Sequence, residues 1–156
     1  MADGFDFKEL EQYEKKLIDL ATKKMPTECK KFVRAEGTKL KRITLRNAKA
    51  SVKKDTGNYF KSIKRGKAYK YRGNDAWAVR VYSYDPKAHL LEKGHRIVTR
   101  GKGKKAKKHY TTLNGGVEKG FVKGYKVFEK SEKSFQNTFY NDIEDFIDDV
   151  LAKGLR

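Results

Sequence analysis

The sequence predicts an α+β fold, in which a small, mostly antiparallel sheet packs against a long N-terminal helix and a long C-terminal helix. Apolar residues recur at helical spacing near both ends of the chain, whereas alternation of apolar and polar residues is confined to the middle. Only two prolines occur in 156 residues, so long Pro-rich linkers are not expected. The length is typical of one domain, and we expect residues 1–156 to form a single unit.

The N-terminal helical region is predicted over residues 5–50. Asp6 can cap it, and Glu9 stands three residues further on, as in a capping box. Apolar residues keep helical spacing on both sides of Pro26. Proline lacks an amide hydrogen and disfavours helix in the residue before it, so we expect a kink or break near Lys24–Met25.

The middle of the chain, residues 55–127, is predicted to hold the sheet. Apolar and polar side chains alternate over 69–71 and again over 77–82, and a Gly-Asn-Asp turn separates these two segments. This arrangement indicates a β-hairpin.

A short helix and a basic loop follow the hairpin. Pro86 suits the start of a helix and Gly94 suits its end. Segment 100–108 carries six basic residues among its nine, and like charges this dense oppose compaction, so we expect a loop that contacts DNA or protein. Its basic residues are Arg100, Lys102, Lys104, Lys105, Lys107 and Lys108.

The C-terminal segment, 128–152, shows the clearest helical pattern. Its apolar residues step by three and four, and aromatic side chains such as Phe135, Phe139 and Phe146 dominate them. We expect this aromatic stripe to lie in the core, where burying a phenylalanine contributes about 1.5–3 kcal/mol. A subunit interface is the alternative position for it.

Charge is distributed unevenly along the chain, which has a net charge of +18. Residues 30–72 include 16 basic and two acidic side chains, whereas residues 131–152 include six acidic and one basic. The acidic helix therefore requires a cationic partner, either the basic helix of a neighbouring copy or the chain's own basic helix. Two solvated faces of a monomer are the simpler alternative. The candidate contact residues are Arg34, Lys41, Arg42, Arg46, Asp145, Asp148 and Asp149.

The sequence offers little chemistry for catalysis or metal binding. His89 and His95 are six residues apart, which fits no standard metal spacing, and the single cysteine, Cys29, cannot form an internal disulfide. A small basic RNase would need acid–base residues from His89, Glu92 and His95. His89 and Glu92 are neighbours, however, simply because they share one predicted short helix. We expect a protein that is not an enzyme and binds no cofactor or metal.

The basic composition favours an acidic partner. Lysines and arginines are interleaved with Tyr69, Tyr71 and Tyr110, as phosphate neutralisation with base stacking would require, but no sequence-specific nucleic-acid-binding motif is present. Sequence-independent nucleic-acid binding is therefore one hypothesis for function. No apolar run approaches the roughly 18 residues of a membrane span. The N-terminus lacks the basic start and apolar core of a signal peptide, so we expect a cytosolic protein without a membrane partner.

Several pieces of the chain, spread over residues 5–152, occur in a recognisable order. A basic helical region leads to a Thr-Gly box and a Ser-Ile pair, then a strand, then a His-Leu-Leu-Glu-Lys-Gly-His box, then a basic Gly-rich loop, and last a Phe-containing box at 122–130 before the final helix. The box residues are Thr56, Gly57, Ser62, Ile63, His89, Glu92 and Gly94. This order resembles the small neck or tail-completion proteins of long-tailed siphophages, also called head–tail joining or minor tail components. Tyr59 stands where that family commonly has Leu, and His95 where it commonly has Thr.

The resemblance implies a structural protein of the virion, located in the neck at the head–tail interface and present in the host cytoplasm during assembly. It implies a homo-oligomeric ring, a hexamer in that family, which contacts neighbouring neck and tail-tube proteins and surrounds the channel that DNA crosses. It carries over no catalytic residue. The residues themselves indicate roles in forming the fold: Gly57 permits a turn with positive φ, Ser62-Ile63 starts the sheet, and Gly94 ends the short helix.

Overall fold

The computed structural model describes residues 7–53, 55–98 and 118–154 of the chain. Helices and strands occur in the following order: α1 Lys8–Asp19, the π-helical stretch η1 Leu20–Lys24, α2 Met25–Ser51, α3 Asn58–Ser62, β1 Ile63–Arg65, β2 Tyr69–Lys70, β3 Trp77–Ala78, β4 Val81–Ser83, α4 Ala88–Lys93, β5 Gly94–Val98, β6 Glu118–Lys123 and α5 Val127–Gly154. Two long helices with short strands between them confirm the predicted α+β fold.

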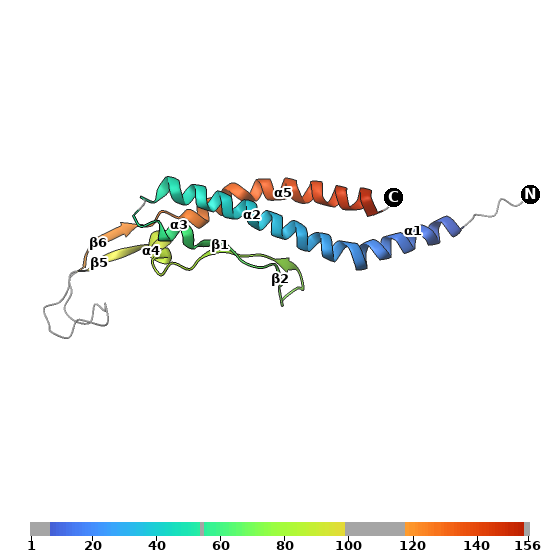
Figure 1. Cartoon of the computed structure of the whole chain (residues 1–156), viewed down its shortest axis with the longest axis horizontal. Helices are drawn as coiled ribbons and strands as arrows, with labels where there is room; N and C mark the ends of the chain where they lie inside the picture. The colour runs from blue at the N-terminus through green and yellow to red at the C-terminus, as the bar shows by residue number, and fades with distance from the viewer. Residues whose placement is uncertain (1–6, 54, 99–117, 155–156) are drawn as a thin grey trace, which may run out of the picture.

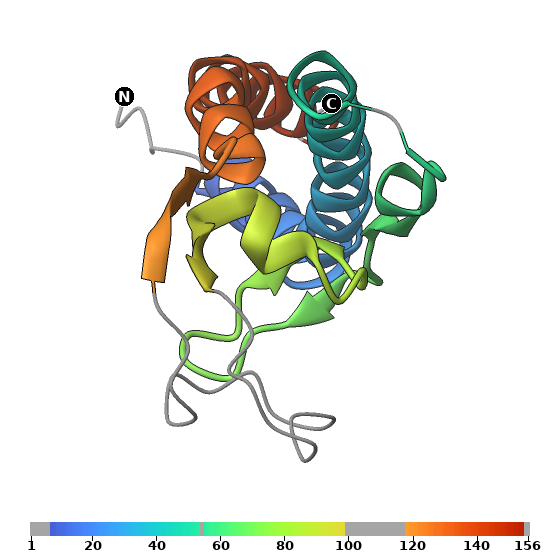
Figure 2. The same cartoon turned by 90° about the vertical axis from the view of Figure 1, so that its left-hand side faces the viewer.

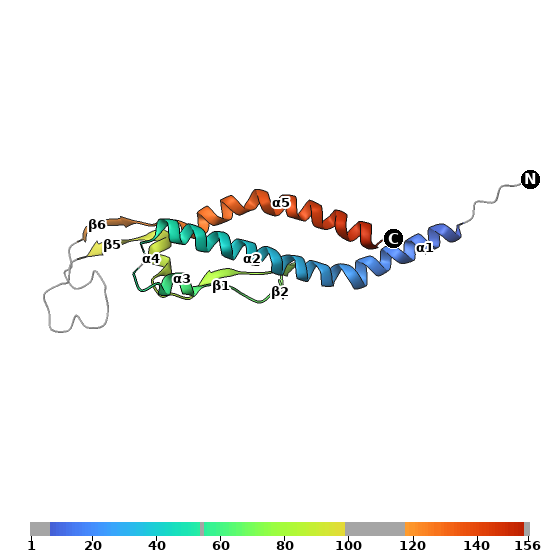
Figure 3. The same cartoon turned by 45° about the horizontal axis from the view of Figure 1, so that its top comes forward.

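The molecule is elongated, with its two long helices side by side (Figure 1). α1, η1 and α2 form one continuous rod, and α5 runs back along α2 in the opposite direction, as Figure 2 also shows end-on. α1 extends past the end of α5, and the β5–β6 ribbon projects beyond the opposite end of the helix pair (Figure 3). The two ends of the long axis are therefore formed by different elements.

All strand pairing in the described residues is antiparallel, in three separate ladders of two strands. β1 pairs with β4 and β2 with β3, and both ladders lie against α2. β5 pairs with β6 in the third ladder, with Gly94 opposite Lys123. The predicted hairpin is confirmed as β2–β3, but its second segment divides at Val79–Arg80, so that β4 leaves the hairpin and pairs with β1.

Of the expected kink or break near Lys24–Met25, the break does not occur, because the backbone stays helical through Pro26, but the helix is irregular there and the rod bends between α1 and α2 (Figure 1). The irregularity lies just before the proline, where η1 adopts π-helical pairing. Proline lacks the N–H that would bond the carbonyl four residues back and crowds that carbonyl, and a local π turn accommodates both effects without ending the rod. Asp6, the expected cap, lies outside the described residues.

The tightest core lies where α2 ends and α5 begins. Ala48, Tyr59, Ile63 and Val127 are buried together there, and Leu91 with other half-buried apolar side chains packs around them. The predicted aromatic stripe of α5 lies further along, against α2. Its rings stack on Phe32 of α2, with centroid distances of 6.1 Å to Phe139 and 4.5 Å to Phe146. These rings are half-buried, so the stripe forms a helix–helix contact rather than an enclosed core.

Close packing of the hairpin against α2 depends on one glycine. A Cβ atom at Gly37 would lie 2.6 Å from Cγ1 of Val79, a contact too short for any side chain there to be accepted without movement. Trp77, Val79 and Val81 are all half-buried, as expected for alternate residues that share a face.

Candidate functional site

The last two family boxes meet at one joint of the structure. Both carboxylate oxygens of Glu92, at the end of α4, accept a hydrogen bond from the backbone N–H of Phe128, at 3.1 and 3.0 Å. One of them also accepts from the N–H of Glu129 at 3.1 Å. These N–H groups belong to the first turn of α5, which has no partner for them within the helix. Glu92 is therefore the cap of α5, supplied by a helix 36 residues earlier in the chain.

Glycines allow the two boxes to approach backbone to backbone. Gly94 has a φ of 85°, and a Cβ atom there would collide with the carbonyl oxygen of Val122 and lie 2.8 Å from the nitrogen of Gly124. A Cβ atom at Gly124 would collide with the carbonyl oxygen of Glu92. The N–H of Tyr125 donates to the carbonyl of Leu91 at 2.7 Å across the same joint. The sequence places both glycines in the boxes, but only the fold brings them into contact.

The first box forms the start of the sheet region. Gly57 has a φ of 79° and precedes α3, as expected from its position in the turn. Ser62 is buried, and its hydroxyl bonds the carbonyl of Tyr59 at 2.6 Å and the hydroxyl of Ser83 on β4 at 2.5 Å. Ile63 is 2% exposed and lies in the core. These residues build and connect elements, which is the role that the sequence indicated for them.

His89, Glu92 and His95, the residues considered for an RNase site, lie in different environments. His89 and His95 are exposed, and the carboxylate of Glu92 is engaged by the backbone of α5. The nearby phenol of Tyr59 is buried, and burial, followed by the charges of Glu92 and Asp85, raises its pKa to about 12. It therefore carries its proton at neutral pH. Within the described residues, no group of three or more His, Cys, Asp or Glu side chains is placed to hold a metal ion.

The basic and acidic helices do meet within one chain, through a residue that sequence reasoning did not select. Nζ of Lys39 on α2 lies 2.8 Å from a carboxylate oxygen of Asp142 on α5 and 2.9 Å from one of Glu36. In the described part of the chain this is the only ion pair between α2 and α5. A short distance along the same contact, Asn47 donates to the hydroxyl of Ser131 at 2.9 Å. The sequence pointed to Lys39 and Asp142 only because they belong to the basic and the acidic segment.

The Lys39 cluster holds two carboxyl groups on one ammonium. Glu36 is 4% exposed, and burial raises its pKa, although Lys39 opposes this effect. The hydrogen bond from Lys39 lowers the pKa of Asp142, while bonds to Asp142 and then Glu36 raise the pKa of Lys39. One buried oxygen of Glu36 has no hydrogen-bond partner among the described atoms, so ionisation of Glu36 is costly in this position.

The contact residues proposed from the sequence lie on the two long helices, and none of them belongs to the Lys39 cluster. Arg34, Arg42 and Arg46 on α2 are exposed, as are Asp145 and Asp148 on α5, and none of them has an ion pair within the described chain. The remaining two are Lys41, which is half-buried, and Asp149, which pairs with Lys153 of its own helix at 2.8 Å. The basic loop at 100–108 and Tyr110 lie outside the described residues.

The hairpin region carries a basic aromatic surface. Lys30 and Lys70 lie over the ring of Trp77, at 5.0 and 6.0 Å from its centroid. Arg80 lies 5.3 Å from the ring centre of Tyr69 and donates to its hydroxyl at 2.7 Å. Lys64 similarly covers Tyr84 on the neighbouring ladder, at 5.1 Å. Cation–π contacts hold these charges above flat rings, an arrangement that also suits phosphates and bases.

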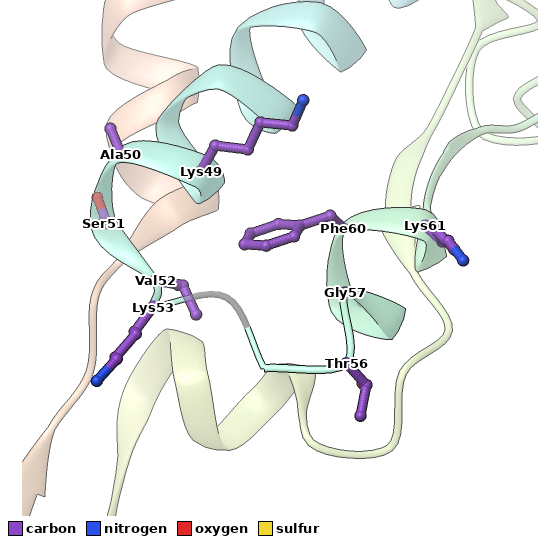
Figure 4. A pocket seen from close by; sticks show the side chains of 9 residues that line it. All are labelled: Lys49, Ala50, Ser51, Val52, Lys53, Thr56, Gly57, Phe60 and Lys61. Carbon is purple, nitrogen blue, oxygen red and sulfur yellow. The ribbon is translucent and has the colours of Figure 1, made fainter.

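A hollow of about 790 Å³ lies between the end of α2 and α3. Figure 4 shows the ring of Phe60 projecting towards the end of α2 across this hollow. Its lining residues are Lys49, Ala50, Ser51, Val52, Lys53, Thr56, Gly57, Phe60 and Lys61. The three lysines give it a basic rim, with the first family box on one side.

Comparison with protein-family models, with curated proteins and with solved structures found no match. In the described ranges, no helix is both long enough and apolar enough to cross a membrane.

Proposed function

We propose that this chain is a structural virion protein of a long-tailed phage, which forms a ring at the head–tail junction around the DNA channel. The observation that carries the proposal is the joint between the last two family boxes. Glu92 and Gly94 of one box contact Phe128, Val122 and their neighbours of the other through backbone atoms and one capping carboxylate. The features that resemble neck proteins therefore have structural roles, as a non-enzymatic assembly protein requires.

The distribution of charge and shape supports assembly into a ring. Exposed arginines lie on α2 and exposed aspartates on α5, so the two long helices of one elongated body carry exposed side chains of opposite charge. A closed ring needs heterologous contacts, in which one patch meets a different patch on the next copy. Exposed ion pairs contribute only about 0–1 kcal/mol each, so these charges set register and specificity.

The triple substitution Asp145→Asn, Asp148→Asn and Asp149→Asn tests the charged contact. It should leave folding intact, because none of these carboxylates bonds another element of the described chain. Ring assembly, followed by sedimentation and negative-stain electron microscopy, should weaken, and the loss should depend on salt. Glu132→Gln on the same helix is the control and should assemble like wild type. A triple variant that assembles like wild type at low and high salt would show that these charges are only a solvated face.

The virion role is tested in the phage that carries the gene. Deletion should give filled heads and complete tails that fail to join, and expression of the chain in trans should restore joined particles. The protein should be detected in purified virions as a small number of copies at the neck. Normal joined particles from the deletion would refute the proposal.

A sequence-independent nucleic-acid-binding protein is the second candidate, because a specific observation favours it. Lys30, Lys64, Lys70 and Arg80 each lie over an aromatic ring on or next to the β1–β4 and β2–β3 ladders. This candidate requires the purified monomer to bind random-sequence DNA with affinity that falls steeply with salt. Trp77→Ala should then weaken binding, since stacking contributes about 1–3 kcal/mol per base. If the purified monomer does not bind DNA, this second candidate is refuted and only the assembly role remains.

A further inference from the structure

One face of α1 is apolar and uncovered. Leu10, Tyr13, Leu17 and Ile18 are 62%, 47%, 38% and 52% exposed, and they stand at helical spacing. None of the residues of α1 is buried. α1 is the outer part of the rod that continues through η1 into α2, and it extends past the end of α5, so the described part of the chain leaves this apolar face without cover.

The β5–β6 ribbon is apolar and exposed on both faces. His95 is opposite Val122, and Arg96 is opposite Phe121, so Phe121 and Val122 lie on opposite faces of the ladder. Phe121 is 60% exposed and Val122 is 40%, while Ile97 on β5 is 45% exposed. A two-stranded ribbon is marginally stable alone, and exposed apolar patches of this kind mark interaction sites.

The charges beside these two apolar surfaces are complementary. Glu14 stands four residues after Leu10 and four before Ile18, so it lies on the apolar face of α1 between them, and Glu11 lies at the edge of that face. Neither carboxylate has an ion pair with the described residues. Lys119 and Lys123 are exposed on β6, beside Phe121 and Val122. Glu11 and Glu14 on this side of the helix are thus opposite in charge to Lys119 and Lys123 on the ribbon.

The two surfaces cannot meet within one chain. α1 forms one end of the long axis of the molecule, and the β5–β6 ribbon projects from the other end, as Figures 1 and 3 both show. A contact between them therefore joins two copies, head to tail. Such a contact uses different patches on the two partners, which is the requirement for a ring.

We propose that α1 of one copy docks through its apolar face on the β5–β6 ribbon of the next copy. This inference rests on the ring proposed above and adds an apolar contact between neighbouring copies to the charged contact of α2 and α5. α1 then gains the apolar cover that its own chain does not supply, and the ribbon gains the packing partner that two strands alone lack. A pairing of α1 with α1 through this face is less favourable because it would bring Glu11 and Glu14 of the two helices together.

Engineered cysteines test which surfaces meet. Cys29 is the only native cysteine, so Cys29→Ser gives a background without thiols. Leu10→Cys and Phe121→Cys are introduced separately, and the two proteins are mixed and oxidised. A disulfide between the two different variants is expected. Lys15→Cys, placed on the side of α1 away from Leu10, is the matched control and should not cross-link to Phe121→Cys.

Other products of this experiment overturn the proposal. A dominant Leu10→Cys homodimer would assign the helix to a contact with itself. Cross-linking of neither variant, at a concentration where the wild type sediments as an oligomer, would place the interface elsewhere. A wild type that stays monomeric at every concentration tested would exclude a second copy as the occupant.

Sedimentation equilibrium provides an independent measurement. Leu10→Asp or Phe121→Asp should weaken self-association at least about tenfold, as expected for an apolar anchor near the centre of an interface. Lys15→Ala should leave it unchanged, and far-UV circular dichroism should show that all three variants stay folded. Unchanged association of both aspartate variants would refute the contact. If rings form but the cross-link does not, this interface is refuted and the proposed function stands. If the cross-link forms in open filaments, the interface is supported and the proposed ring is refuted.

Discussion

Replacing Glu92 by alanine should destabilise the chain by separating α4 from α5. The substitution removes three hydrogen bonds of 3.0–3.1 Å from a carboxylate to the N–H groups of Phe128 and Glu129. Loss of a capping side chain typically costs about 0.5–2 kcal/mol, and a negative charge at a helix N-terminus contributes about 0.3–1 kcal/mol more. We therefore expect the free energy of unfolding to fall by about 1–3 kcal/mol.

The measurement is urea unfolding followed by circular dichroism at 222 nm. Glu92→Gln keeps one carbonyl acceptor but no charge, so its loss should lie between zero and that of alanine. Glu132→Ala is the matched control, because Glu132 is exposed on α5 and makes no ion pair with the described residues. The capping role is refuted if Glu92→Ala unfolds within about 0.5 kcal/mol of Glu132→Ala, the usual range of surface substitutions.

Three further substitutions probe other parts of the fold, each by urea unfolding. Phe139→Ala should cost about 2–3 kcal/mol, at the lower end for a phenylalanine because the ring is half-buried against Phe32; a loss below about 1 kcal/mol would show that the stripe does not hold α5 to α2. Gly94→Ala should cost at least about 1–3 kcal/mol from its φ of 85° alone, and a neutral result would exclude the backbone contact. The raised pKa of Glu36 means that its contribution to stability is present below the unfolded pKa of the carboxyl and is lost as the pH rises through the folded pKa. Glu36→Gln should therefore gain stability relative to wild type between pH 4.5 and pH 7, and a difference independent of pH would contradict this sign.

The hollow beside Phe60 and the basic aromatic surface give the molecule two further regions suited to anions. Both lie on the α3 and hairpin side of α2, whereas the acidic residues concentrate on α5. Lys39 on α2 and Asp142 on α5 join the two long helices by an ion pair.

The sequence alone determined the class and order of the elements. Periodicity predicted both long helices to within a few residues of their ends, because an amphipathic stripe is a property of neighbouring positions along one helix. The turn at Gly57 and the helix end at Gly94 followed in the same way from the conformations that only glycine adopts readily. These features depend on local interactions, which the order of residues specifies.

Only the tertiary structure decided what the distant residues do for one another. Glu92 resembled half of an acid–base pair in the sequence, and its role as the cap of α5 depends on a segment 36 residues away. The basic and acidic helices predicted an ionic contact, but Lys39 was not among the proposed residues. Which of the many lysines faces Asp142 is set by the rotation and axial position of two packed helices. Those are decided by apolar contacts such as Phe32 against Phe139 and Phe146, so the charge pattern could predict the kind of contact but not its members.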